Sequence, residues 1–143
     1  MATARPDRTV KIDFRVYFPP EVVDDADSRL GKEKIFQLSV TDANGKLGIS
    51  LKSVTYGEYG GWGKYDPKYE KPPIDCLDMA CYLHDLTCEH KNIGRVQRDH
   101  ALQNAVRAMR KQGLLKSTGA RVLSYTVTSW LFNFGSWVIS FLP

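Results

Sequence analysis

Cysteine is scarce in this chain and forms no pattern. The only three, Cys76, Cys81 and Cys88, fall within one stretch that we expect to be helical. At a helical rise of about 1.5 Å per residue, Cys76 and Cys88 lie too far apart to bridge, and the other two pairs are badly placed as well. We therefore expect no internal disulfide, which favours a reducing compartment or a protein that does not depend on oxidation.

Several other signals are missing. The cysteines have no CxxC spacing, and His84, His90 and His100 form no HExxH arrangement, so zinc is disfavoured. The N-terminus has no apolar stretch behind its charged residues, so we expect no secretory signal. There is no internal repeat and no low-complexity tract.

The overall composition is that of an ordinary globular protein. The chain has 143 residues, of which 43% are apolar and 25% charged, and these fractions exclude wholesale disorder and a multi-span membrane protein. Its length is that of one domain with a modest core. A net charge of +4 favours anionic surfaces, and a bilayer suits this balance as well as nucleic acid does.

The first third of the chain predicts a small β region. Apolar residues alternate with polar ones from Val10 to Phe18, the pattern of a half-buried strand, and Pro19-Pro20 ends it. The apolar runs 35–40 and 47–54 flank Asn44-Gly45, a turn signal consistent with a hairpin. We interpret this region as a scaffold or docking surface, because nothing in it looks chemical.

From Asp75 the apolar spacing changes to that of a helix. Asp75 can cap the helix, and Asp78 lies in the first turn, where the helix dipole favours a carboxylate. His84 falls within the apolar stripe and should face inward. A second helix is predicted from about Arg95 to Gln112, ended by Gly113.

The two predicted helices form an antiparallel hairpin, and with the β region they make an α+β fold. We divide the chain into a β region at 1–55, a core at 56–112 and an apolar segment at 113–143, within one compact domain.

The hairpin predicts a contact between His84 and Asp99. The two residues are equally far in sequence from the Lys91–Asn92 bond, so they come level if the turn is centred there. A carboxylate that holds one imidazole nitrogen orients the ring and raises its basicity, as a general base requires. Asp85 lies about 100° further round the helix and is free to bind a cation.

A glycine-rich loop supplies further oxygen ligands. It reads Tyr-Gly-Glu-Tyr-Gly-Gly-Trp-Gly over residues 56–63, and Gly60, Gly61 and Gly63 let the backbone turn its carbonyls inward. Ca²⁺ accepts several oxygen ligands, including backbone carbonyls, so calcium is the expected cation.

These segments resemble the secreted-type phospholipases A2. The loop is similar to that family's Tyr-Gly-x-Tyr-Cys-Gly-x-Gly, with Gly60 in place of cysteine. Residues 73–85 follow its Pro-x-Asp-x-x-Asp-x-Cys-Cys-x-x-His-Asp, with Ala80 in place of the first cysteine. The missing disulfide partners make the chain similar to the bridge-free version in parvoviral minor capsid proteins. The resemblance covers roughly residues 56–109.

The resemblance implies calcium-dependent hydrolysis of the sn-2 ester of a glycerophospholipid. His84 would activate a water and Asp99 would support it. The implied ligands of calcium are the carbonyls of Tyr59, Gly61 and Gly63 and the carboxylate of Asp85. It also implies a phospholipid membrane surface as partner, and the similarity to capsid proteins indicates a viral protein. The sequence does not fix the location, which is left open between the virion and intracellular membranes, and we expect no nucleic acid as partner.

The chain departs from the family pattern in two places near the site. The segment between Gly63 and Pro73 is a few residues longer than usual, so 65–69 must bulge out. Cys88 stands where many relatives have a tyrosine that supports the second-helix carboxylate.

The C-terminal stretch from Val122 to Pro143 has no charged residue. On a helix, Val127, Trp130, Leu131 and the apolar residues after them would share one face, and Trp130 and Trp137 are suited to headgroup depth. Contact with a membrane interface, cover over the helical hairpin, and an added strand at 122–131 all remain open.

Two other functions also remain open. One is a non-catalytic lipid-binding or protein-interaction module on the same scaffold. The other is a basic nucleic-acid-binding domain, which would need its Lys and Arg residues concentrated on one face; this is the least favoured.

Overall fold

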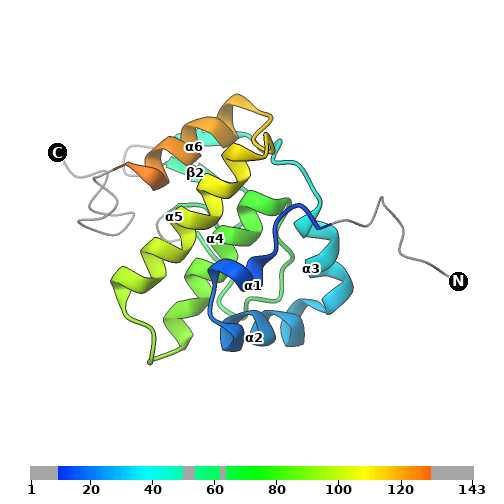
Figure 1. Ribbon diagram of the computed structural model, residues 1–143, viewed down its shortest axis with the longest axis vertical. Helices are drawn as coiled ribbons and strands as arrows, with labels where there is room; N and C mark the ends of the chain where they lie inside the picture. The colour runs from blue at the N-terminus through cyan, green and yellow to red at the C-terminus, as the bar shows by residue number, and fades with distance from the viewer. Residues whose placement is uncertain (1–9, 50–53, 62–63, 130–143) are drawn as a thin grey trace, which may run out of the picture.

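The computed structural model describes residues 10–49, 54–61 and 64–129, which form a group of helices with one small sheet beside α6 (Figure 1). In chain order the elements are α1 (Phe14–Tyr17), α2 (Pro20–Leu30), α3 (Lys32–Ser39), β1 (Leu47–Ile49), β2 (Val54–Tyr56), α4 (Cys76–Leu86), the 3₁₀ helix η2 (Thr87–Glu89), α5 (Arg95–Lys111) and α6 (Thr118–Thr128). Helix α4 is central and packs against α5, α2 and α3. The predicted α+β class is confirmed.

The predicted strands at 10–18 and 35–40 are wrong, because α1 forms at 14–17 and α3 covers 35–39, and neither segment lies in a strand. Phe14 and Phe18, one helical turn apart, are both buried, whereas Val16 between them is 68% exposed. A strand would have placed all three on one face. Asp13 caps α1 by accepting from the backbone N–H of Arg15, and Pro20 starts α2 at a position where a missing N–H costs nothing.

The hairpin is present and β1 lies within the predicted run 47–54, but its partner is β2 and not the run 35–40. β1 and β2 pair antiparallel in the register Leu47 with Tyr56, Gly48 with Thr55 and Ile49 with Val54. Asn44-Gly45 precedes both strands instead of joining them. Gly45 donates its backbone N–H to the Tyr56 hydroxyl at 2.7 Å, and a Cβ on Gly45 would lie 2.6 Å from the Tyr56 ring. The glycine therefore serves a close contact, not the hairpin turn.

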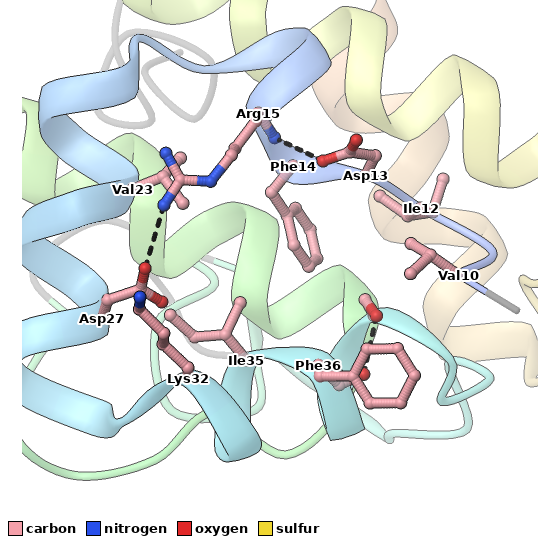
Figure 2. Close-up of a pocket in the computed structure, with 11 residues that line it drawn as sticks. Val10, Ile12, Asp13, Phe14, Arg15, Val23, Asp27, Lys32, Ile35 and Phe36 are labelled. Carbon is pink, nitrogen blue, oxygen red and sulfur yellow. Dashed lines mark hydrogen bonds and ion pairs between the residues drawn. The ribbon is translucent and has the colours of Figure 1, made fainter. Parts of the chain in front are cut away.

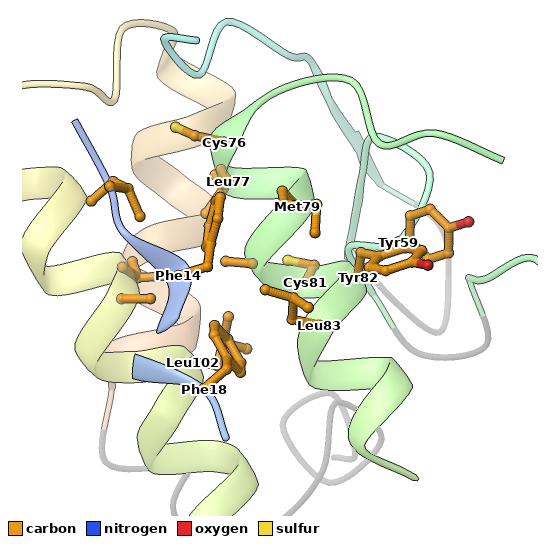
Figure 3. Packing of buried hydrophobic residues seen from close by; sticks show 14 of the residues in the cluster. Phe14, Phe18, Tyr59, Cys76, Leu77, Met79, Cys81, Tyr82, Leu83 and Leu102 are labelled. Carbon is orange, nitrogen blue, oxygen red and sulfur yellow. The ribbon is translucent and has the colours of Figure 1, made fainter. Parts of the chain in front are cut away.

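The helical hairpin is confirmed. Asp75 caps α4 by accepting from the backbone N–H of Asp78, and α4 and α5 run side by side in opposite directions (Figure 1). Leu77, Cys81 and Leu102 belong to the buried cluster shown in Figure 3, which Phe14 and Phe18 complete from the N-terminal side. All three cysteines are free, as expected, so packing instead of disulfides stabilises the hairpin.

Helix α6 covers one side of the helical hairpin and the sheet. It packs on α5, β1 and β2, and it buries Ala120, Leu123, Ser124 and Val127. Cover over the hairpin is thus confirmed for the buried side of this helix, and a strand beginning at 122 is wrong. The predicted interfacial residues Trp130, Leu131 and Trp137 lie outside the described residues. Among the described residues, no helix is long and apolar enough to cross a bilayer.

Candidate functional site

His84 and Asp99 meet between α4 and α5. The Nε2 atom of His84 lies 2.9 Å from Oδ1 of Asp99, at hydrogen-bonding distance, and both residues are buried. The predicted contact is confirmed. Because Oδ1 of Asp99 accepts a hydrogen bond from Nε2–H, the tautomer that keeps a lone pair on Nδ1 is favoured.

Asp85 stands at the other nitrogen of the same ring. Its Oδ1 lies 3.6 Å from Nδ1 of His84. Burial acts to lower the pKa of His84, but its contacts with Asp85 and Asp99 outweigh burial, so the pKa is raised above its ordinary value. Burial raises the pKa of the Asp85 carboxyl to about 6, although the neighbouring imidazole opposes this.

Asp78 anchors the glycine-rich loop to α4. Its Oδ1 accepts from the backbone N–H of Tyr59 at 2.9 Å, and its Oδ2 accepts from those of Glu58 and Ile74, each at 2.9 Å. The side chain is fully buried, and burial raises its pKa to about 6 against the effect of these bonds. Sequence reasoning gave Asp78 only a role with the helix dipole and missed this clamp.

The loop and Asp85 share one side of α4. Asp78, Tyr82 and Asp85 are spaced by four and three residues, so their side chains fall on the same helical face. The Tyr59 ring packs edge-on against the Tyr82 ring, with centroids 4.9 Å apart. Tyr59 of the loop therefore lies over Tyr82, on the helical face that also carries Asp85.

The loop conformation depends on its glycines. Gly57 has φ +58°, and a Cβ there would lie 2.5 Å from Cγ of Asp78. Gly61 has φ +114°, and a Cβ there would lie 2.6 Å from the carbonyl oxygen of Val54. Both positions require glycine, since side chains at positive φ are strained and neither site has room for one.

Of the four predicted calcium ligands, three lie in the described residues: Tyr59, Gly61 and Asp85. The carbonyl of Gly61 accepts from the backbone N–H of Lys64 at 3.3 Å, which leaves it a second lone pair. Gly63 lies outside the described residues. No group of three or more His, Cys, Asp or Glu side chains in the described part of the chain could hold a metal ion, but a site of one carboxylate and several carbonyls is not of that kind.

Asp75 ties the loop to the helix at a second point. Its Oδ2 accepts from the hydroxyl of Tyr56, the first residue of the loop, at 2.6 Å. Neither Tyr56 nor Asp78 was predicted as a site residue. The sequence did contain a signal for this role. Two aspartates, Asp75 and Asp78, lie at the start of the helix, although one carboxylate is enough for an N-cap.

The segment 64–71 packs against the site from outside. The Tyr69 hydroxyl donates to the backbone carbonyl of Asp85 at 3.3 Å, and the Tyr82 hydroxyl donates to the carbonyl of Tyr69 at 2.7 Å. Arg29 of α2 donates to the carbonyl of Lys68 at 2.8 Å. The extra residues of this segment are therefore held against α4 and α2.

A second histidine–carboxylate pair lies away from the site. Nε2 of His90 lies 2.9 Å from Oδ2 of Asp25, whose other oxygen accepts from Nε of Arg29 at 2.8 Å. His90 is half-buried. Its geometry matches that of His84 with Asp99, but it lies outside the glycine-loop and α4 constellation.

A cavity of about 300 Å³ opens between α1, α2 and α3 (Figure 2). Phe14, Val23 and Ile35 form its apolar part, and Arg15, Asp27 and Lys32 bring charge to it. Arg15 is already paired with Asp24 and Asp27, at 2.8 and 2.9 Å. The cavity shares no residue with the His84 site.

Comparison with known proteins finds no counterpart for the whole chain: no family model fits it, and no curated protein or solved structure matches it. The geometry of the described residues and the motifs at 56–63 and 73–85 are therefore the features that indicate a function.

Proposed function

We propose that this protein is a calcium-dependent, phospholipase A2-like hydrolase of the sn-2 ester of glycerophospholipids. One observation carries the proposal: the buried His84–Asp99 pair joins α5 to α4, the helix to which Asp78 clamps the glycine-rich loop. Imidazole, carboxylate and oxygen-rich loop are the three parts that water-activated ester hydrolysis requires.

The residues divide the chemistry as follows. Asp99 holds Nε2–H of His84, which leaves the Nδ1 lone pair to take a proton from a water molecule. The water oxygen forms a bond to the ester carbonyl carbon as that proton moves to Nδ1. His84 then returns the proton to the alkoxide of the departing lysophospholipid as the ester C–O bond breaks. The contact with Asp99 favours the protonated imidazole, which makes His84 a stronger base for the first step.

The oxygen donors at the site fit a hard cation. Asp85 is a largely buried carboxylate whose pKa is raised to about 6, so the protein alone compensates its negative charge poorly. Asp85 would hold calcium together with the carbonyls of Tyr59, Gly61 and Gly63. When bound, calcium would supply positive charge to the oxyanion that develops on the ester carbonyl.

The test compares two matched histidine variants. His84→Gln should reduce calcium-dependent release of fatty acid from phosphatidylcholine vesicles by roughly 10²- to 10⁴-fold, the usual contribution of a general base. His90→Gln is the control, because His90 has the same 2.9 Å contact with a carboxylate outside the site. It should keep nearly full activity.

Equal losses in the two variants would contradict the proposal. Vesicle binding that is unchanged by a chelator, with no fatty acid released by the wild type, would instead support the non-catalytic lipid-binding module. Unfolding curves of both variants separate loss of activity from loss of structure.

A further inference from the structure

The positive charge of this protein is concentrated in its C-terminal part. Between His100 and Ser129 there are five basic residues and no acidic one: Arg107, Arg110, Lys111, Lys116 and Arg121. Residues 130–143 carry no charge, and the whole chain has a net charge of +4. The first 99 residues therefore have a net charge of −1. The excess positive charge of the chain comes entirely from α5, α6 and their connection.

The fold brings much of this charge onto one surface. Arg110 of α5 donates to Ser124 Oγ at 2.7 Å and to Thr128 Oγ1 at 2.9 Å, and its guanidinium lies 5.1 Å from the centroid of the Tyr125 ring on α6. Arg107 lies one turn before Arg110 on α5. Arg121 and Val122 lie one turn before Tyr125 on α6. We call these five residues, Arg107, Arg110, Arg121, Val122 and Tyr125, the basic face.

No carboxylate neutralises the basic face within the described residues. Arg107 donates to the Asn104 side chain, Arg110 to hydroxyls, and Arg121 to the carbonyl of Leu115. Arg15 and Arg29 elsewhere in the molecule, by contrast, each pair with aspartates. The basic face thus presents an uncompensated positive potential to solvent.

Apolar groups lie among these cations. Tyr125 is 68% exposed and Val122 is 40% exposed, and both belong to the face just defined. An exposed aromatic ring and an aliphatic side chain surrounded by arginines suit the headgroup layer of a membrane, where apolar and anionic surfaces meet. The phosphate backbone of a nucleic acid has no apolar surface that Val122 could contact.

We propose that the basic face docks this protein on an anionic phospholipid bilayer. The choice of a lipid surface over another polyanion rests in part on the proposed function. The positive charge and the exposed apolar residues are observed independently of that function. Attraction between Lys or Arg and anionic lipids contributes about a fivefold gain in binding for each residue near the surface.

The experiment measures sedimentation of the full chain with vesicles, in the presence of a chelator and in the His84→Gln background, so that turnover plays no part. The His84→Gln protein with no surface substitution should bind vesicles of phosphatidylcholine mixed with phosphatidylserine far better than vesicles of phosphatidylcholine alone. NaCl should weaken this binding. R107Q/K111Q, which changes one basic-face residue and the lysine beside it, should weaken binding roughly thirtyfold. K32Q/K91Q removes the same charge from exposed positions elsewhere and should have little effect.

Three results would overturn the inference: equal binding to neutral and anionic vesicles, equal losses in the two double variants, or tighter binding to single-stranded or duplex DNA than to anionic vesicles at the same salt concentration. Selective vesicle binding by the wild type with no esterase activity would leave this inference standing while the proposed function fails. Both double variants carry exposed substitutions, so unfolding midpoints near that of the wild type are the folding control.

Discussion

Three aspartates of the α4 region differ in what surrounds them. Asp75 accepts from the Tyr56 hydroxyl and the N–H of Asp78. Asp78 accepts three backbone N–H groups. Asp85 faces the His84 imidazole at 3.6 Å. The first two therefore position the loop, whereas the third is the carboxylate suited to a cation. These roles follow from the groups that each side chain contacts, because all three residues are aspartates at the start of or within the same helix.

Asp78 should make stability depend on pH. Its pKa is raised by burial from 3.8 to about 6, so the folded state favours the protonated form, and stability is lost as pH rises through 6. Asp78→Asn removes this titration. The free energy of unfolding of the variant should therefore gain about 2 kcal/mol relative to the wild type between pH 4 and pH 7. Urea unfolding at both pH values measures it, and a pH-independent difference would show that Asp78 does not carry this shift.

At the scale of elements, the glycine-rich loop and α4 form one hydrogen-bonded unit. The loop starts where β2 ends, is held at Glu58 and Tyr59 by Asp78, and packs through Tyr59 on Tyr82. The orientation of the loop carbonyls thus depends on the first turn of α4, two turns away from Asp85. A small displacement of the loop should disturb the proposed cation site before it disturbs the core.

Gly57→Ala tests this unit. Its positive φ costs about 1–2 kcal/mol for a residue with a Cβ, and the new Cβ would meet the Asp78 carboxylate at 2.5 Å. We expect a loss of about 2 kcal/mol or more in unfolding free energy, together with weaker calcium binding by calorimetry. Gly94→Ala is the control, because nothing lies within 4 Å of its Cβ and its φ is −77°. If both variants retained wild-type calcium binding, the loop would not be the ligand.

At the scale of the whole molecule, α6 completes the core. Residues from α1, α4, α5 and α6 join one buried cluster, and Gln103 of α5 donates to the Val127 carbonyl at 3.1 Å. The outer side of the same helix carries Arg121, Val122 and Tyr125. One helix therefore stabilises the hairpin that holds His84 and Asp99 and also presents the proposed membrane-docking surface.

Neighbouring residues of α6 should respond very differently to truncation. Leu123 is fully buried, so Leu123→Ala should cost about 2–5 kcal/mol through lost burial and a cavity. Val122→Ala, next to it on the exposed side, should change the unfolding free energy by no more than about 0.5 kcal/mol. Denaturant unfolding of both variants decides this, and similar costs would mean that α6 is not packed as described.

The sequence by itself determined the helical hairpin and the meeting of His84 with Asp99. Helix caps, apolar spacing and a short connection are local signals in the sequence. Two helices joined by a short turn pack antiparallel, because the turn brings the end of one next to the start of the other. It also determined that no disulfide is needed, since the spacing of the three cysteines forbids bridges along one helix.

Only the tertiary structure decided the rest. The alternating pattern at 10–18 fits a strand, but Phe14 and Phe18 pack into the core as successive turns of helical chain while Val16 faces solvent. The clamp of Asp78 on Glu58 and Tyr59 joins residues about twenty positions apart, and the basic face joins two helices. Such contacts depend on how elements pack against each other, a property that the periodicity of a single segment does not contain.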